Sequence, residues 1–226
     1  MAPTWLSRSE GIETPSRFSR RPPPFLAGPA RMLMTETKSD LRARMRIERK
    51  RLKAAHPDAG RETVVGVHAL LGSLTFEPHT VALYLPLGSE IDPAPLAEEF
   101  HRRCLKLALP RVDASGEAMT FRAWRPGDAT EPDLQGCNAP LATAEIVEPD
   151  LFILPLVAFD RTGGRLGQGG GYYDRTLAAL RGHVRPVFVG LAFAGQEVPR
   201  VPIDAHDQKL DGILTERGYM PARKDA

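Results

Sequence analysis

The chain has 226 residues, 42% of them hydrophobic, so it can bury one substantial core and is expected to form one main domain. The formal net charge is +2, but residues 1–34 alone carry five arginines against two glutamates, which leaves −1 for the rest of the chain. Because the body is not basic and no apolar run has membrane-spanning length, we expect neither nucleic-acid binding nor a membrane protein.

The two cysteines, Cys104 and Cys137, are far apart in the sequence and form no Cys-x-x-Cys pattern. This usage favours reduced thiols over a disulfide or zinc scaffold and predicts a cytoplasmic protein. We expect its partner to be a small molecule and the chain to be monomeric.

Residues 1–34 are rich in proline, arginine and serine and show no apolar periodicity. This composition predicts a disordered N-terminal extension, followed by one folded domain over residues 35–226. Three interpretations of the extension are open: a tail, an organelle-targeting peptide, or an upstream start codon with Met32 or Met34 as the true start. A run of three prolines disfavours the amphipathic helix that targeting requires, so a tail or an upstream start is favoured.

A helix is predicted over residues 37–55, where Thr37 is a candidate N-cap and Leu41, Met45 and Leu52 are spaced for one apolar stripe. Its other faces are crowded with arginine and lysine. The simplest interpretation of these charges is a solvated surface.

The next elements form a β-α-β unit. Residues 62–74 have apolar side chains at helical spacing and predict a second helix. Residues 80–87 are a nearly unbroken apolar run, which is typical of a strand buried on both faces. A helix that begins near Asp92-Pro93 and a strand over residues 105–109 follow. This order predicts an α/β fold with a mainly parallel sheet between helices on both faces.

Further strands are predicted over residues 118–124, 151–159 and 187–193, with a turn at residues 125–128 and a helix over residues 175–180. The pair His206-Asp207 suggests a hydrolytic triad or a transition-metal site. Neither is supported, because the chain has no Gly-x-Ser-x-Gly elbow and no second histidine at ligand spacing.

Six glycines fall within the nine positions 163–171, between a predicted buried strand and a predicted helix. Such a density costs backbone entropy unless the chain needs positive φ or the close approach of another molecule. The helix start and Arg165 offer N–H groups and positive charge for phosphate, and Asp174 offers a hard oxygen for magnesium. A flexible surface turn is the alternative, and the spacing matches neither a P-loop nor a Gly-x-Gly-x-x-Gly motif.

The segment from Phe159 to Asp174 reads Phe-Asp-x-x-Gly-Gly-Arg-Leu-Gly-x-Gly-Gly-Gly-Tyr-Tyr-Asp. It resembles the signature of the 5-formyltetrahydrofolate cyclo-ligases, also called methenyltetrahydrofolate synthetases, and the similarity runs from about Lys38 to Glu216. The resemblance implies a three-layer fold of the NagB/RpiA type. It also implies an enzyme that converts 5-formyltetrahydrofolate and Mg-ATP to 5,10-methenyltetrahydrofolate, ADP and phosphate, by phosphorylating the formyl oxygen so that N10 can close the ring.

The resemblance implies roles for individual residues, with ATP and magnesium as cofactors and a reduced folate as substrate. The implied catalytic residues are Glu90, Arg165 and Tyr173, and the implied folate-binding residues are Glu90, Arg111 and Tyr173. The implied magnesium ligands are Asp174 and Asp207. The residues implied to bind ATP are Lys38, Arg42, Arg165, Leu166, Gly167, Gln168, Gly169, Gly170, Gly171, Tyr172 and Tyr173.

Two features concern the pocket wall. Trp124 could line a pterin pocket, although a half-buried strand tryptophan is the simpler interpretation. The family commonly has a Gly-Ile-Pro-Glu-Pro-like segment where this chain has Gly-Cys-Asn-Ala-Pro at residues 136–140, so the resemblance does not extend to this part of the wall.

Two other functional classes remain open. A paralogue of the same fold could act on another formylated, pterin-like or thiamine-related compound. A non-catalytic nucleotide-binding module is the other alternative, and ATP binding without folate-dependent turnover would favour it.

Overall fold

The structure is a computed structural model, and it describes residues 36–180 and 186–223. The predicted disorder of residues 1–34 lies outside the described residues. No helix in the described ranges is both long and apolar enough to cross a membrane.

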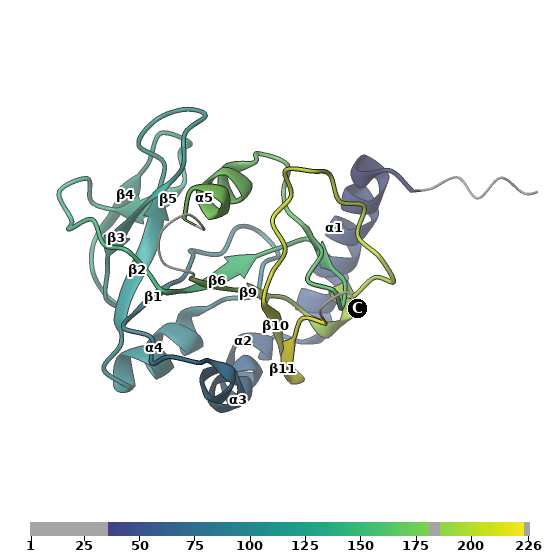
Figure 1. The fold of residues 1–226 in the computed structure, drawn as a ribbon, viewed down its shortest axis with the longest axis horizontal. Helices are drawn as coiled ribbons and strands as arrows, with labels where there is room; N and C mark the ends of the chain where they lie inside the picture. Colours follow the sequence, from purple (N-terminus) through teal and green to yellow (C-terminus); the bar gives the residue numbers. More distant parts are fainter. Residues whose placement is uncertain (1–35, 181–185, 224–226) are drawn as a thin grey trace, which may run out of the picture. The chain divides into compact units, whose positions relative to one another are not determined.

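The centre of the described structure is a seven-stranded sheet with the order β11-β10-β9-β6-β1-β2-β3 (Figure 1). The five inner strands are parallel, and only the edge strands β3 and β11 are antiparallel to their neighbours. The mainly parallel sheet expected from the sequence is therefore confirmed. The strands are β1 (Thr80–Ala82), β2 (Lys106–Arg111), β3 (Thr120–Ala123), β6 (Leu151–Pro155), β9 (Val187–Leu191), β10 (Gly212–Thr215) and β11 (Gly218–Pro221).

Helices cover both faces of this sheet (Figure 1). On one face lie α2 (Ala59–Glu62), α3 (Val67–Ser73) and α4 (Ala94–Arg102), and on the other lies α5 (Tyr172–Leu180). This arrangement gives the three layers that the β-α-β pattern predicts.

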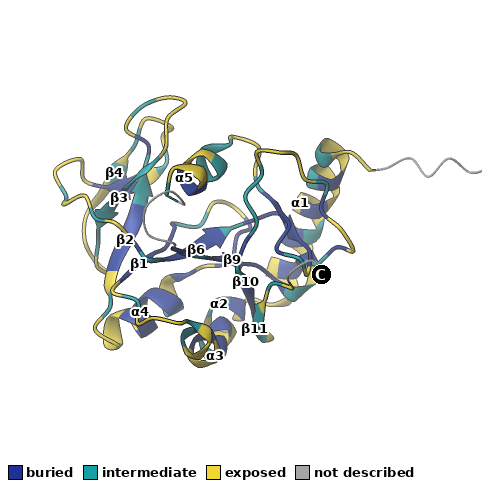
Figure 2. Ribbon diagram, viewed as in Figure 1, coloured by how far each residue is buried: buried dark blue, intermediate teal, exposed yellow. Residues whose placement is uncertain are grey.

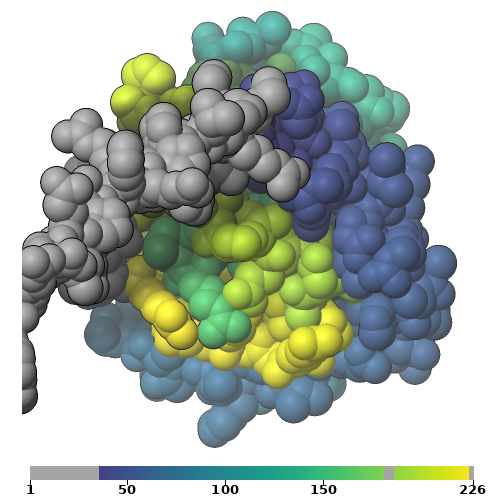
Figure 3. Space-filling view, turned by 90° about the vertical axis from the view of Figure 1, so that its right-hand side faces the viewer, coloured from purple at the N-terminus to yellow at the C-terminus, as the bar shows by residue number. Residues whose placement is uncertain are grey.

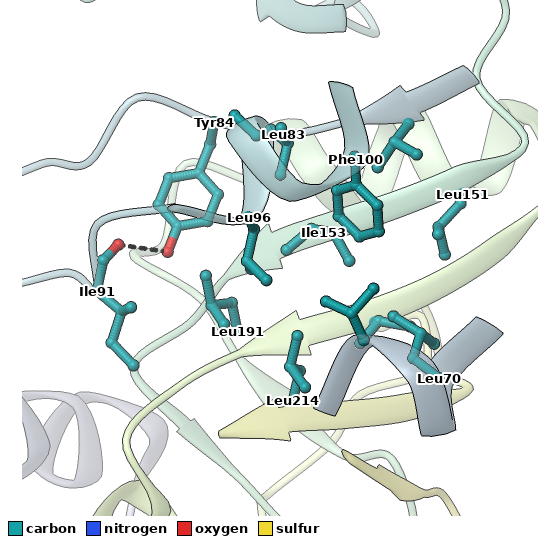
Figure 4. Packing of buried hydrophobic residues seen from close by; sticks show 14 of the residues in the cluster. Leu70, Leu83, Tyr84, Ile91, Leu96, Phe100, Leu151, Ile153, Leu191 and Leu214 are labelled. Atoms are coloured by element: carbon teal, nitrogen blue, oxygen red, sulfur yellow. Dashed lines mark hydrogen bonds between the residues drawn. The ribbon is translucent and has the colours of Figure 1, made fainter. Parts of the chain in front are cut away.

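Alternate residues of each inner strand enter opposite halves of the core, because successive side chains of a strand point to opposite faces. Leu151 and Ile153 of β6 pack with α4 residues Leu96 and Phe100 (Figure 4). Phe152 and Leu154 of the same strand pack on the α5 side instead, with Leu177. The sheet is thus buried on both faces (Figure 2), which explains the nearly continuous apolar runs in its strands.

The first helix, α1 (Lys38–Ala55), begins where the sequence predicts. The Thr37 hydroxyl accepts the Asp40 backbone N–H at 3.2 Å, which caps the helix. Leu41, Met45 and Leu52 are buried, as their spacing predicts.

The prediction of a single regular helix over residues 62–74 is wrong. The segment is divided into α2, a 3-10 helix η1 (Thr63–Gly66) and α3. A Cβ at Gly66 would lie 2.4 Å from Leu214 Cδ1 and 3.0 Å from the Tyr219 backbone nitrogen, so η1 packs directly against β10 and β11. This close approach to the sheet accompanies the interruption of the regular helix.

The predicted strand over residues 151–159 is also divided, because β6 ends at Pro155 and β7 (Ala158–Phe159) pairs with β8 (Arg165–Leu166) as a separate hairpin. Gly163 and Gly164 turn this hairpin, while the later glycines connect β8 to α5. The helix itself begins at Tyr172, earlier than the predicted start at residue 175. The remaining elements are β4 (Thr130–Pro132), β5 (Asn138–Pro140) and the 3-10 helix η2 (Ala194–Gln196).

Candidate active site

A cavity of about 580 Å³ opens at the carboxyl ends of the parallel strands. Pro110 and Pro155, at the ends of β2 and β6, line it together with Leu85, which follows β1. Open α/β sheets bind their ligands at this edge. Of the residues singled out from the sequence, those that line it are Lys38, Arg42, Glu90, every residue from Arg165 to Asp174, and Asp207.

Helix α1 holds the glycine-rich loop on one side of the cavity. Arg42 Nε donates to the Gly167 carbonyl oxygen at 2.9 Å, and Arg46 donates to the backbone and side-chain oxygens of Gln168 at 3.0 and 3.1 Å. In the space-filling view, the purple surface of α1 also lies next to a yellow-green surface that belongs to the chain near residue 200 (Figure 3). The loop therefore owes its position to a helix more than a hundred residues earlier, as the 125-residue separation of Arg42 and Gly167 shows.

Between β8 and α5, over residues 167–171, two glycines have backbone conformations that favour glycine: φ is 108° at Gly169 and 69° at Gly171. Gly171 directly precedes α5, so the loop ends at the N-terminus of a nine-residue helix. Backbone N–H groups and the positive end of a helix dipole favour an anion at such a position.

Arg165 and Tyr173 line the same cavity and contact one another. The Arg165 side chain is only 3% exposed, donates to Asp174 Oδ1, and has its Cζ 5.9 Å from the centre of the Tyr173 ring. Within the described residues, Arg165 Nε is buried and has no hydrogen-bond partner. Burial, followed by the charge of Glu90, raises the pKa of Tyr173 well above its ordinary value, so the phenol keeps its proton and can donate a hydrogen bond.

Lys38 forms ion pairs with two carboxylates of the segment after residue 200. Its Nζ lies 2.7 Å from Asp204 Oδ2 and also contacts Asp207 Oδ2. Burial would raise the pKa of Asp207, but the hydrogen bond from Lys38 and the Asp204 backbone N–H outweigh it and lower the pKa. Asp207 therefore stays ionised.

Glu90 also lines the cavity and is buried, with 4% of its side chain exposed. Its Oε2 accepts the Leu87 backbone N–H at 2.9 Å, while Oε1 accepts from Gln168 Nε2 at 3.1 Å and Arg49 Nη1 at 3.4 Å. A direct hydrogen bond from Gln168 thus joins the glycine-rich loop to the loop after β1 that carries Glu90.

Arg111 is not among the residues that line the cavity. Its guanidinium donates to the Pro140 carbonyl oxygen at 2.7 Å and forms ion pairs with Glu131 and Asp113 at 3.0 and 3.1 Å. These contacts tie β2 to the small β4–β5 sheet.

Trp124 also lies outside the cavity lining and is a partly buried residue packed against the core. The divergent segment 136–140 does contribute to the cavity, through Cys137 and Asn138. The departure from the family pattern therefore falls on the wall of the candidate site.

The donors present fit a magnesium ion that is bound together with phosphate. No group of three or more histidine, cysteine or acidic side chains within the described ranges could hold a metal by itself. Asp174 and Asp207 both line the cavity, and the Gln208 backbone N–H lies 3.4 Å from Asp174 Oδ1, which brings the two segments together. Magnesium is commonly held by one or two carboxylates with the phosphates of a substrate.

Sequence reasoning missed Arg49, Asp204 and Tyr84. Asp204 and Tyr84 line the cavity, and no local pattern singles them out. Arg49 had a usable signal, because it stands four residues after Met45 and three before Leu52, within the apolar stripe of α1. An arginine at a buried helical position predicts a buried partner.

Comparisons with known proteins agree with this arrangement. A model of the 5-formyltetrahydrofolate cyclo-ligase family matches residues 34–216. The chain is similar to the 5-formyltetrahydrofolate cyclo-ligase of Escherichia coli K12, with 33% identity over 176 residues that cover 74% of this chain and 95% of that protein. It is also similar to the enzyme of the same name from Mycolicibacterium smegmatis, with 31% identity over 83% of this chain and 98% of that protein. The solved structure of Aquifex aeolicus 5,10-methenyltetrahydrofolate synthetase superimposes with a TM-score of 0.65 at 31% identity, covering 84% of this chain and 94% of that one.

Proposed function

Because the chain belongs to the 5-formyltetrahydrofolate cyclo-ligase family and is an enzyme converting 5-formyltetrahydrofolate to 5,10-methenyltetrahydrofolate, we propose that its cavity binds this folate beside Mg-ATP. The observation that carries the proposal is a single cavity that joins the glycine-rich loop and its cations to Glu90. A reaction between a nucleotide and a folate needs both in one enclosed site.

The nucleotide end consists of Lys38, Arg42 and the segment from Arg165 to Tyr173. Arg165 is well suited to phosphate, because its buried Nε has no partner among the described residues and guanidinium groups bind phosphate oxygens in pairs. Asp174 and Asp207 would hold magnesium, which supplies positive charge that offsets the phosphates. The chain itself positions the reactants and neutralises charge, so it needs no covalent nucleophile.

We place the folate end around Glu90. The cavity lining also includes four apolar side chains, Leu85, Leu109, Val112 and Met119. An apolar wall with a few fixed polar groups is typical of a site for a ring-containing ligand. Tyr173 has Arg165 Cζ 5.9 Å from its ring centre and feels the charge of Glu90, so we propose that its phenolic hydrogen is donated to one of the two reactants. We propose that Arg111, which faces the β4–β5 sheet, supports the wall and does not contact the folate.

The test is a direct assay of purified protein with 5-formyltetrahydrofolate, ATP and magnesium. The expected result is formation of the 5,10-methenyltetrahydrofolate chromophore with one equivalent each of ADP and phosphate. Omission of ATP, or chelation of magnesium, should abolish the signal. ATP binding without any folate-dependent turnover would favour a nucleotide-binding module, and turnover of another formylated compound in preference to the folate would favour a paralogue.

We further propose that the enzyme acts as a cytoplasmic monomer. The support is that one chain supplies both ends of the cavity. Analytical ultracentrifugation of active enzyme tests the monomer, and a dimer at assay concentration would contradict it.

A further inference from the structure

Arg49 is a charged residue in an otherwise apolar stripe of α1, and its side chain is only 6% exposed. Its Nε donates to Ser89 Oγ at 3.1 Å, and its Nη1 donates to the Leu156 carbonyl oxygen at 3.1 Å and contacts Glu90 Oε1 at 3.4 Å. Two of these partners are neighbours in the loop after β1, and the third follows β6. One guanidinium therefore fixes the Glu90 loop relative to the central sheet.

The contacts of Glu90 leave little of its carboxylate for a ligand. A carboxylate offers about four acceptor positions, two on each oxygen. Oε1 accepts from Arg49 and Gln168, and Oε2 accepts the Leu87 backbone N–H. About one acceptor position remains, on Oε2, and Glu90 lines the cavity.

We propose that Arg49 is a positioning residue for folate binding. It occupies Oε1 and holds the Glu90 loop so that the open position on Oε2 receives a hydrogen-bond donor of the folate. The inference rests on the proposed folate role of Glu90, and it adds a residue that itself does not line the cavity.

A double-mutant cycle tests this role. Arg49→Met, Glu90→Gln and the double variant are assayed for the folate KM, the ATP KM, kcat and melting temperature. Each single substitution is expected to raise the folate KM about tenfold, the effect of losing a hydrogen bond to a charged group, with the ATP KM changed less than about twofold. The double variant should be no worse than Glu90→Gln alone, because Arg49 acts through Glu90.

Two further variants sharpen the result. Arg49→Lys keeps the charge but lacks the planar fork, so its folate KM is expected between those of wild type and Arg49→Met. If Arg49→Met fails to fold, the same cycle is run with Arg49→Lys. Lys53→Met is the matched control: Lys53 is exposed on the same helix and donates to the Gly88 carbonyl oxygen of the same loop, so its loss should leave the folate KM unchanged.

The possible failures are distinguishable. If Glu90→Gln leaves the folate KM unchanged, the proposed placement of the folate is wrong and the inference falls with it. If Glu90→Gln raises that KM while the Arg49 variants raise both KM values equally, or multiply the Glu90 effect in the double variant, Arg49 has only a structural role. That outcome overturns the inference and leaves the proposed function standing.

Discussion

Arg165 and Asp174 form an ion pair between β8 and the first turn of α5, and their side chains are 3% and 31% exposed. Lys38 and Asp207 form a second pair of the same kind. Each pair joins a cation proposed to bind phosphate to a carboxylate proposed to bind magnesium. Because each of these cations is already paired with a carboxylate, the nucleotide alone or magnesium alone is expected to bind weakly. The two ligands together are expected to bind tightly.

The first prediction concerns Arg165. Substitution by alanine should raise the ATP KM about tenfold to a hundredfold, because the loss of a charged hydrogen bond costs roughly 1.5–3 kcal/mol. Arg161→Ala is the matched control, since Arg161 belongs to the same hairpin but pairs with Glu197 and does not line the cavity. Steady-state kinetics at saturating folate measure both variants. Equal ATP KM values for Arg165→Ala and wild type would rule out the phosphate role.

The second prediction concerns the metal. Asp174→Asn should raise the magnesium concentration needed for half-maximal activity and weaken magnesium binding in the presence of ADP, because an amide supplies an oxygen without the charge. Magnesium titrations by calorimetry and by activity measure the change. Asp128→Asn makes the same chemical change in the turn after β3, outside this cavity, and should behave like wild type. Titration curves of Asp174→Asn that overlay those of wild type would show that Asp174 is not a ligand.

The third prediction concerns pH. Burial would raise the pKa of Asp160, but hydrogen bonds from the Val201, Thr162 and Gly164 backbone N–H groups and from the Thr162 hydroxyl lower it below its usual value of 3.8. A lowered folded-state pKa stabilises the fold above pH 3.8, and this stabilisation is lost as the pH falls through the lower folded value. Asp160→Asn should therefore reduce the free energy of unfolding by roughly 1–3 kcal/mol at neutral pH.

The same measurement contains its own check. Unfolding by urea is followed from neutral pH to about pH 3, and the difference between wild type and Asp160→Asn should shrink toward the acid end. A difference that stays constant over the whole range would show that the Asp160 charge does not contribute.

The fourth prediction separates a glycine needed for folding, Gly163, from a glycine needed for binding, Gly167. Gly163 has φ of +82°, and a Cβ there would lie 2.3 Å from the Leu210 carbonyl oxygen. Gly163→Ala should cost at least roughly 2 kcal/mol in stability. A Cβ added at Gly167 would have no other atom within 4 Å, and Gly167 lines the cavity. Gly167→Ala should therefore change the free energy of unfolding by less than about 0.5 kcal/mol but raise the ATP KM.

Chemical denaturation and ATP kinetics on both variants provide the measurement. Normal ATP binding by Gly167→Ala would mean that the nucleotide does not approach this residue. A Gly163→Ala variant as stable as wild type would mean that the hairpin tolerates a different turn.

Local patterns in the sequence were sufficient for the elements whose causes are local. The cap at Thr37 and the 3.6-residue spacing of Leu41 and Met45 determine α1, and the apolar runs separated by α4 determine the β-α-β unit. The glycine-rich signature likewise pointed to the cavity that the structure contains. Capping, periodicity and turn composition act over a few residues, so a single sequence reveals them.

Only the tertiary structure decided which distant side chains meet. Arg49 and Glu90 are 41 residues apart and Lys38 and Asp207 are 169 apart, and no periodicity relates either pair. Arg111 stands at the end of β2, yet its guanidinium is held by the β4–β5 sheet, away from the cavity lining. These partners are determined when the helices pack on the sheet, because a buried charge then needs a counter-charge within reach. Which residues come within reach depends on the whole fold, so no local stretch of sequence reveals it.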